Sequence, residues 1–130
     1  MEFLHTDRDI AVILKPVGMD SEREAPAAIA QALGGQVFPI HRLDQNVGGC
    51  MVYARTRPAA AALSRAVQDG QMKKEYVARV HGPPPESGDW QDLLWKDSAK
   101  NKVFVVKRER KGVKPARLEF TRLSAGETSL

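Results

Sequence analysis

Apolar and polar residues alternate in short blocks along the first part of the chain, and turn-forming residues separate these blocks. Two apolar runs predict strands over residues 2–5 and 10–15, and a Lys-Pro-Val-Gly turn ends the second of them. Ser21 stands where it would cap a helix over residues 22–33, and a pair of glycines terminates that helix. This stretch therefore predicts two strands followed by one helix.

The next stretch predicts extended chain and then a third strand. Pro39 disfavours a helix over residues 36–44, so these residues are expected to be extended. Small and branched residues predict a buried strand over residues 48–55. Cys50 lies in this strand, where a cysteine is far more often a small buried hydrophobic residue than a nucleophile.

Residues 56–70 carry the clearest helical pattern of the chain. Thr56 is the predicted N-cap, and a proline follows in the first turn. Leu63 and Val67 lie one turn apart on the face predicted to be buried, and Gly70 ends the helix.

Residues 73–82 alternate in polarity, with Tyr76, Ala78 and Val80 on one face, and this period predicts a strand. Prolines predict a loop over residues 82–89.

The remaining sequence predicts more strands. Residues 101–123 predict a hairpin with its turn near Lys111 and Gly112. Residues 126–130 predict a turn and the start of another strand, which indicates either a domain truncated at the C-terminus or a sequence that gives only part of the chain. Residues 1–130 are thus expected to form one partial domain of the α+β class, a mixed, mostly antiparallel sheet with packed helices.

The composition favours a globular chain outside the membrane. No apolar run approaches the ~20 residues of a membrane-spanning helix, and the first residues do not resemble a signal peptide. The single cysteine, Cys50, excludes an internal disulfide. These features favour a reducing cytoplasm and no membrane partner. A monomer is expected.

The net charge of +4 is unevenly distributed. Nine basic and two acidic residues between Lys96 and Arg117 give a local charge of +7, which leaves −3 for the rest of the chain. Such an excess suits a phosphate-bearing partner. A solvated basic hairpin explains it equally well, so charge alone leaves both interpretations open.

One short block combines a carboxylate, a cation and glycines. In His-Arg-Leu-Asp, residues 41–44, Asp44 follows extended chain and precedes Gly48 and Gly49, which allow a substrate to approach closely. Such a carboxylate can act as a nucleophile or a base. Arg42 would share its face on a strand and could hold the carboxylate ionised or contact phosphate. Taken alone, the block is better explained as an Asp–Arg pair that satisfies itself.

Three motifs occur in order along the chain: Lys15-Pro16-Val17-Gly18; the His41–Asp44 block followed by Gly49 and an apolar strand; and a segment with Lys74, Tyr76, Ala78, Val80 and Gly82. Together they resemble the RluA-type family of RNA pseudouridine synthases. Residues 96–102 and 112–123 are similar to the family's following segment, so the resemblance covers nearly the whole chain.

The resemblance implies an enzyme that detaches a uridine base from its ribose in ribosomal or transfer RNA, rotates it and rejoins it through C5. It implies that Asp44 is the catalytic residue and that Tyr76 lines the pocket for the flipped base. It also implies that Arg42 fills the gap left in the RNA, and that Lys15 and His41 contact the substrate. RNA would be the partner, and no metal or organic cofactor would be needed.

The chain departs from the family pattern in two places. Where the family usually has Thr-Ser-Gly, this chain has Val47, Gly48 and Gly49, so two hydroxyls are lost. A Gly-Arg-x-His-Gln-Ile-Arg type segment, whose basic residue pairs with the catalytic aspartate in the family, does not occur before Leu130.

Other interpretations remain open. A non-catalytic RNA-binding remnant with the same fold fits the end at Leu130, whereas retention of Asp44, Arg42 and Tyr76 favours the enzyme. An unrelated hydrolase would need a second catalytic acid, which the sequence does not place. The three histidines lack metal-ligand spacing, so no zinc site is predicted.

Overall fold

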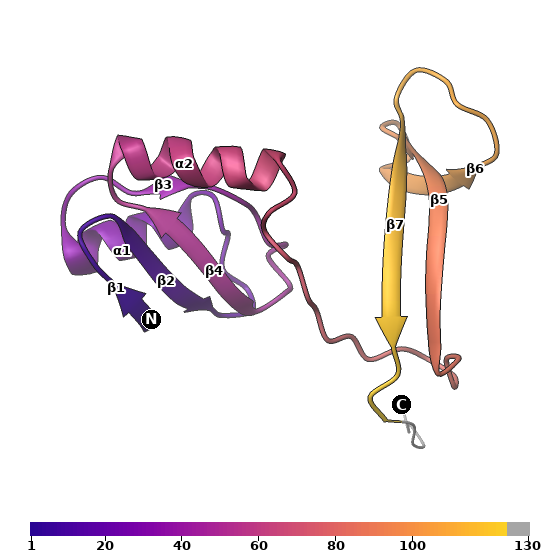
Figure 1. Cartoon of the computed structure of the whole chain (residues 1–130), viewed down its shortest axis with the longest axis horizontal. Helices are drawn as coiled ribbons and strands as arrows, with labels where there is room; N and C mark the ends of the chain where they lie inside the picture. Colours follow the sequence, from indigo (N-terminus) through magenta and orange to yellow (C-terminus); the bar gives the residue numbers. More distant parts are fainter. Residues whose placement is uncertain (125–130) are drawn as a thin grey trace. The chain divides into compact units, whose positions relative to one another are not determined.

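The computed structural model describes residues 1–124 and has two compact units, Met1–Glu75 and the residues from Tyr76 onward (Figure 1). Each unit has its own antiparallel sheet, and both helices belong to the first unit. The α+β class predicted from the sequence is confirmed. All described strand pairs are antiparallel, so no mixed sheet forms among these residues.

The sheet of the first unit has the strand order β1-β2-β4-β3. Its strands are β1 (Glu2–Thr6), β2 (Ile10–Lys15), β3 (Phe38–Pro39) and β4 (Gly49–Ala54). Strand β2 pairs along its whole length with β4, from Ile10 opposite Ala54 to Lys15 opposite Gly49. The end of β2 and the start of β4 therefore lie side by side.

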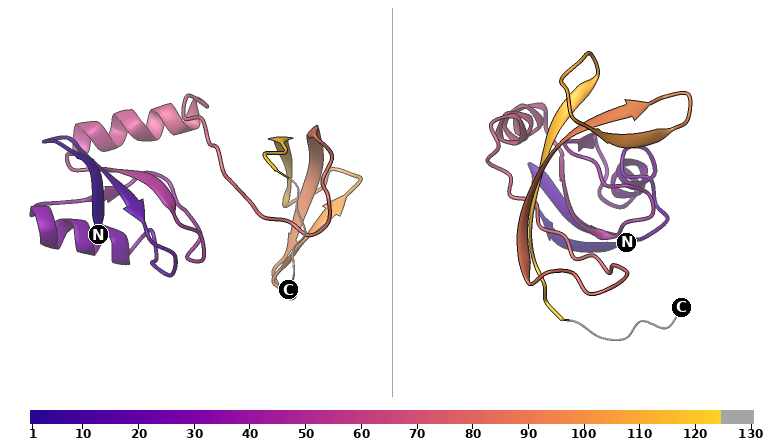
Figure 2. Two further views of the ribbon diagram at one scale, coloured as in Figure 1. Left: turned by 90° about the horizontal axis from the view of Figure 1, so that it is seen from below. Right: turned by 90° about the vertical axis from the view of Figure 1, so that its right-hand side faces the viewer.

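Two helices lie on opposite sides of this sheet, α1 (Glu24–Leu33) and α2 (Arg57–Gln68) (Figure 2). Alternating residues of β2 and β4 face α1 because side chains of a strand point to opposite faces in turn. The buried core on this side comprises Ala11, Ile13, Ala25, Ile29, Met51 and Tyr53.

Helix α2 begins as the sequence predicts. The Thr56 hydroxyl accepts a hydrogen bond from the backbone N–H of Ala59 at 3.2 Å, which satisfies one of the unpaired donors of the first turn. Leu63 and Val67 lie half-buried, as expected for a helix that covers a sheet from one side only.

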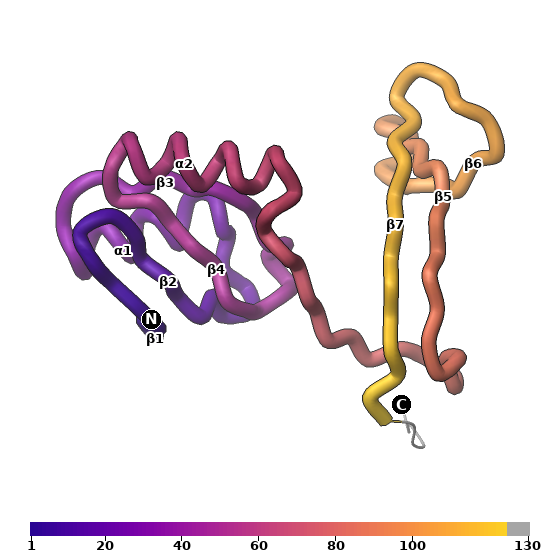
Figure 3. The backbone as a smooth tube through the Cα atoms, in the orientation of Figure 1, coloured from indigo at the N-terminus to yellow at the C-terminus, as the bar shows by residue number. Residues whose placement is uncertain are grey.

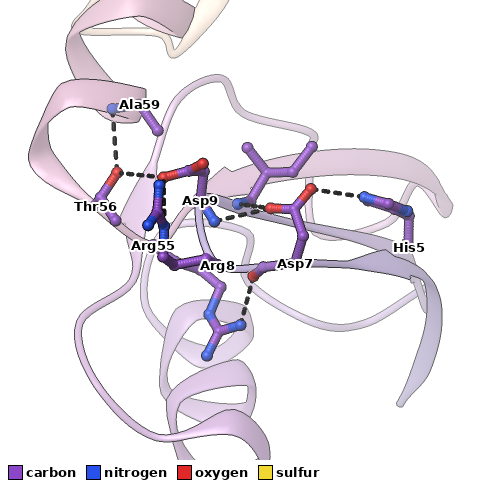
Figure 4. Close-up of polar contacts among 8 residues, drawn as sticks. His5, Asp7, Arg8, Asp9, Arg55, Thr56 and Ala59 are labelled. Carbon is purple, nitrogen blue, oxygen red and sulfur yellow. Dashed lines mark hydrogen bonds and ion pairs between the residues drawn. The ribbon is translucent and has the colours of Figure 1, made fainter.

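The turn between β1 and β2 makes hydrogen bonds to Arg55, which follows β4, and to Thr56, the N-cap of α2 (Figure 4). The Asp7 carboxylate accepts hydrogen bonds from His5 and from the backbone N–H groups of Asp9 and Ile10, which hold the pKa of Asp7 at about 2. The Arg55 guanidinium donates to the backbone carbonyl of Asp7 at 2.6 Å. The end of β4 is thus tied to a turn far away in sequence.

Two local predictions for the first unit are wrong. Ser21 does not cap α1, because Arg23 occupies the N-cap position and no side chain accepts a hydrogen bond there. The stretch 36–44 contains no helix, as predicted, and its only strand residues are Phe38 and Pro39, which pair with β4. Cys50 is exposed, because β4 buries its other face through Met51 and Tyr53.

The second unit is a three-stranded sheet with the order β6-β5-β7. Its strands are β5 (Ser87–Asp97), β6 (Lys102–Val106) and β7 (Val113–Thr121), and Figure 3 follows the long β5 and β7 as they run side by side. The predicted hairpin over residues 101–123 is wrong, because β6 and β7 both pair with β5 rather than with each other. The predicted loop 82–89 ends early, as β5 begins at Ser87.

Residues 73–82 do not form the predicted strand. Their alternating pattern is present, but no described strand pairs with them, and a strand needs a neighbour to satisfy its backbone groups. The segment predicted over residues 126–130 lies outside the described residues.

Two aromatic pairs mark opposite faces of the second sheet. Trp90 and Phe120 lie on one face with ring centroids 4.6 Å apart, and Trp95 and Phe104 lie on the other at 6.3 Å.

No helix within residues 1–124 is long and apolar enough to cross a membrane.

Candidate active site

Two loops meet where β2 ends and β4 begins, and one of them carries Asp44. The backbone N–H of Gly18 donates to the carbonyl of Gln45 at 2.7 Å, and the Gln45 side-chain amide returns a hydrogen bond to the Gly18 carbonyl at 2.9 Å. Val47 donates its N–H to the Asp44 carbonyl at 2.9 Å and closes a turn. The Lys-Pro-Val-Gly turn thus clamps the residue next to Asp44.

The Lys15 side chain lies against both of these loops and is only 1 % exposed. Its ammonium donates to the carbonyls of Pro16 at 2.9 Å and Met19 at 2.8 Å, with a longer contact of 3.5 Å to the carbonyl of Gln45. An ammonium buried without such acceptors would be strongly destabilising. The amino group therefore stabilises both loops, and its predicted contact with a substrate stays a prediction.

A second support approaches the Asp44 loop from α1's side of the sheet. The buried Ser21 hydroxyl accepts a hydrogen bond from the Leu43 N–H at 3.1 Å, and the Ser21 carbonyl accepts one from the Tyr53 hydroxyl at 2.6 Å. Burial raises the pKa of Tyr53 to about 12, with smaller effects of the same sign from Asp20 and Glu22. Sequence reasoning missed Ser21, Tyr53 and Gln45 as supports, because each works through a partner far away in sequence.

Asp44 itself is exposed, and among residues 1–124 its carboxylate has no hydrogen-bond or ion-pair partner. Residues 41–44 are not a strand, so the shared strand face predicted for Arg42 and Asp44 does not exist. The Arg42 guanidinium instead lies 3.3 Å from the Glu22 carboxylate, and both side chains are largely exposed. The self-satisfied Asp–Arg pair is therefore not formed, and Asp44 is free to meet a ligand.

His41 faces inward at the start of this block. Its Nε2 accepts a hydrogen bond from the backbone N–H of Val52 at 3.2 Å, which requires a neutral ring. Burial lowers the pKa of His41, and the charge of Lys74 lowers it further. The ring joins the loop to β4, and its predicted contact with a substrate stays a prediction.

Tyr76 belongs to the second unit and is 64 % exposed. Of the predicted site residues, the structure gathers Lys15, His41, Arg42 and Asp44 in the first unit. Tyr76 carries an unburied ring on an extended segment, so its predicted role in the base pocket stays a prediction.

The unusual Val47-Gly48-Gly49 sequence has a steric reason. A Cβ atom at Gly48 would lie 3.1 Å from the Lys15 carbonyl oxygen and 3.3 Å from a methyl group of Val17. Glycine therefore lets the Asp44 loop approach the Lys-Pro-Val-Gly turn while that turn carries valine.

No group of three or more metal-ligating side chains forms within the described part of the chain. The side-chain group exposed at this site is the Asp44 carboxylate, on a loop that hydrogen bonds hold in place.

Comparisons with known proteins address the family directly. The family model for RNA pseudouridylate synthase matches residues 9–129. The dual-specificity RNA pseudouridine synthase RluA of Escherichia coli is 30% identical over 128 residues, covering 90% of this chain and 56% of the relative. The chain belongs to the RluA-type family of RNA pseudouridine synthases.

Other relatives agree with this family. The tRNA pseudouridine synthase C of Haemophilus ducreyi is 30% identical over 98 residues, which are 68% of this chain and 40% of the relative. The solved structure of human RNA pseudouridylate synthase domain containing 4 matches with a TM-score of 0.70 at 20% identity, covering 96% of this chain and 54% of that one. This last likeness shows the fold. The chain spans about half the length, or less, of these relatives.

Replacing Lys15 with methionine is expected to lower the free energy of unfolding by about 1–3 kcal/mol, because the carbonyls of Pro16 and Met19 lose their donor. Urea unfolding followed by far-ultraviolet circular dichroism measures the change. Lys73→Met, at an exposed position, is the control and is expected to have little effect. Equal stability of the two variants would show that the Lys15 hydrogen bonds do not brace the loops.

The inward-facing His41 predicts a pH dependence of stability. Its pKa is lowered from 6.5 in the folded chain, so as pH falls below about 6.5 the unfolded chain takes up a proton that the folded chain does not. The contribution of neutral His41 to the free energy of unfolding is therefore fully present above about pH 6.5 and is lost as the pH falls. Urea midpoints between about pH 7.5 and 5.5 test this. The decrease is expected to flatten in His41→Gln and to persist in His81→Gln; the same slope in both variants would assign it to another group.

Gly48 and Val17 are expected to be energetically coupled. Gly48→Ser crowds the exposed Val17 side chain and the Lys15 carbonyl, so the expected cost is about 1 kcal/mol, the low end for overpacking. Val17→Ala in the same chain is expected to recover at least about 0.5 kcal/mol in a double-mutant cycle of unfolding free energies. Simple additivity of the two substitutions would refute the contact.

Proposed function

We propose that this chain takes part in converting a uridine of ribosomal or transfer RNA into pseudouridine, with Asp44 as the catalytic residue. The observation that carries the proposal is an exposed carboxylate without a partner in the described chain, on a loop braced by Lys15, Gly18 and Ser21. Family membership supplies the reaction, and relatives of this chain are named for RNA and tRNA.

The reaction moves a base without adding or removing atoms overall. The bond between N1 of uracil and the ribose breaks, the base rotates, and a bond forms between C5 and the ribose. The hydrogen on C5 leaves as a proton, and N1 takes up a proton from solvent. A carboxylate can assist by attacking the sugar or by removing a sugar proton, and both routes need Asp44 at a fixed place. The hydrogen bonds to Gly18 and Lys15 supply that placement through Gln45.

The uridine must leave the RNA stack before it reaches the carboxylate, which costs a few kcal/mol. We propose that Tyr76 packs against the flipped base and that Arg42 stacks in the space left behind. Both side chains are exposed, and the ion pair of Arg42 with Glu22 is a surface pair that contributes little to stability, so RNA can displace it. Binding of RNA without catalysis is the second candidate function, favoured by the excess of basic residues between Lys96 and Arg117.

The test uses RNA with tritium at C5 of uridine, because formation of the new bond releases that hydrogen. Ribosomal and transfer RNA are assayed separately with the unaltered chain and with Asp44→Asn. Release is expected to fall by about 10²- to 10⁴-fold or more in Asp44→Asn, because the substitution removes the reacting oxygen.

Asp69→Asn removes another exposed carboxylate of the first unit and is the matched control. It is expected to keep the rate of the unaltered chain. An equal loss in both variants would contradict a special role for Asp44. No release from the unaltered chain, with RNA still bound, would favour the second candidate function.

A further inference from the structure

The second unit carries a dense set of basic side chains with few acidic partners. Eight of the nine basic residues between Lys96 and Arg117 are exposed and form no ion pair within residues 1–124. Arg117 is the exception, since Asp89 at 2.8 Å and Glu119 at 2.6 Å neutralise it. Five of these exposed cations lie outside the strands, in the β5–β6 turn (Lys100) and in the loop between β6 and β7 (Lys107, Arg108, Arg110 and Lys111).

Aromatic rings lie at the same end of this sheet. Trp95 of β5 is paired with Phe104 of β6, and the Arg110 guanidinium from the β6–β7 loop lies 4.5 Å from the centre of the Trp95 ring. Phe104 is 40% exposed on this face. Trp90, the other tryptophan, packs against Phe120 on the opposite face.

We propose that Trp95, Phe104 and Arg110, with the surrounding lysines, form a binding surface for single-stranded RNA. The proposal rests on the proposed function and adds a second RNA contact outside the Asp44 loop. Nucleobases have flat π-faces that stack on aromatic rings and on guanidinium planes. The phosphates along the same strand attract the unpaired cations.

Charge complementarity and ring geometry favour RNA over an acidic protein as the occupant. A carboxylate-rich protein would be attracted to the cations but gains nothing from a stacked Trp–Arg platform. A duplex hides its base faces and offers only its backbone. Single-stranded RNA uses both parts of the surface.

Tryptophan fluorescence tests the stacking directly. Addition of oligouridylate to the full chain is expected to quench Trp95. The quench is expected to remain in Trp90→Phe and to disappear in Trp95→Phe, although Phe at position 95 still binds RNA in an anisotropy titration. Trp95→Ala is expected to weaken that binding about tenfold or more. A quench that follows Trp90, or unchanged affinity in Trp95→Ala, would overturn the proposal.

The salt dependence of binding tests the charges. Lys107→Gln with Arg108→Gln removes two cations from the β6–β7 loop, where no strand pairing depends on them. This double variant is expected to lower the slope of log affinity against log salt by about 1.4, because each contact to a single strand contributes about 0.7. Arg57→Gln with Arg65→Gln on α2 removes the same charge and is expected to keep the slope. Equal slopes in both double variants would show that net charge alone attracts RNA.

Two further arms separate this surface from the reaction and from other partners. Asp44→Asn is expected to keep the Trp95 quench while it loses tritium release, so failure of the reaction leaves the surface testable. Polyglutamate is expected to cause no quench. A quench by polyglutamate equal to that of oligouridylate would overturn recognition of RNA by stacking.

Discussion

The buried ammonium of Lys15 is the constraint on which the Asp44 site depends. A charged group that is 1 % exposed must be hydrogen-bonded, and here its acceptors are backbone carbonyls of two different loops. These carbonyls can converge only if the turn after β2 bends around the lysine and the loop before β4 lies against it. Gly48 follows from the same requirement, since a Cβ atom there would lie 3.1 Å from the Lys15 carbonyl oxygen and would push against the turn after β2. Lys15 therefore helps to hold the loop that carries Asp44, and this role requires no contact with a substrate.

The division of work among the polar groups is consistent with a preorganised site. Within the described chain, every buried polar side-chain atom has a hydrogen-bond partner. Lys15, Ser21, Tyr53 and His41 all direct their polar atoms toward the backbone of neighbouring segments. The Asp44 carboxylate, by contrast, is exposed and has no hydrogen-bond or ion-pair partner within residues 1–124. Under the proposed function, these supporting hydrogen bonds would keep Asp44 in place when RNA binds.

The two units of the chain are stabilised in different ways. The first covers its sheet with helices and buries a core, so its loops can be held rigidly. The second is a sheet without helices among the described residues, and cross-strand pairs such as Trp90 with Phe120 hold it together. Its exposed rings, and the cations that form no ion pair within residues 1–124, are therefore available for the proposed contacts with RNA rather than buried in a core.

The sequence by itself determined the elements whose signals are local. Strands β1, β2 and β4, both helices and the Thr56 cap follow from hydrophobic period and capping chemistry within a few residues, and the ordered motifs indicated the family and singled out Asp44. Only the tertiary structure decided which strands pair. It placed β5 between β6 and β7, left residues 73–82 without a partner and exposed Cys50. It also showed that Ser21, predicted as a helix cap, accepts a hydrogen bond from Leu43 and that Lys15 is buried. The physical reason is the same in each case: pairing, burial and the satisfaction of a buried charge depend on groups that are distant in sequence and meet only in the folded chain.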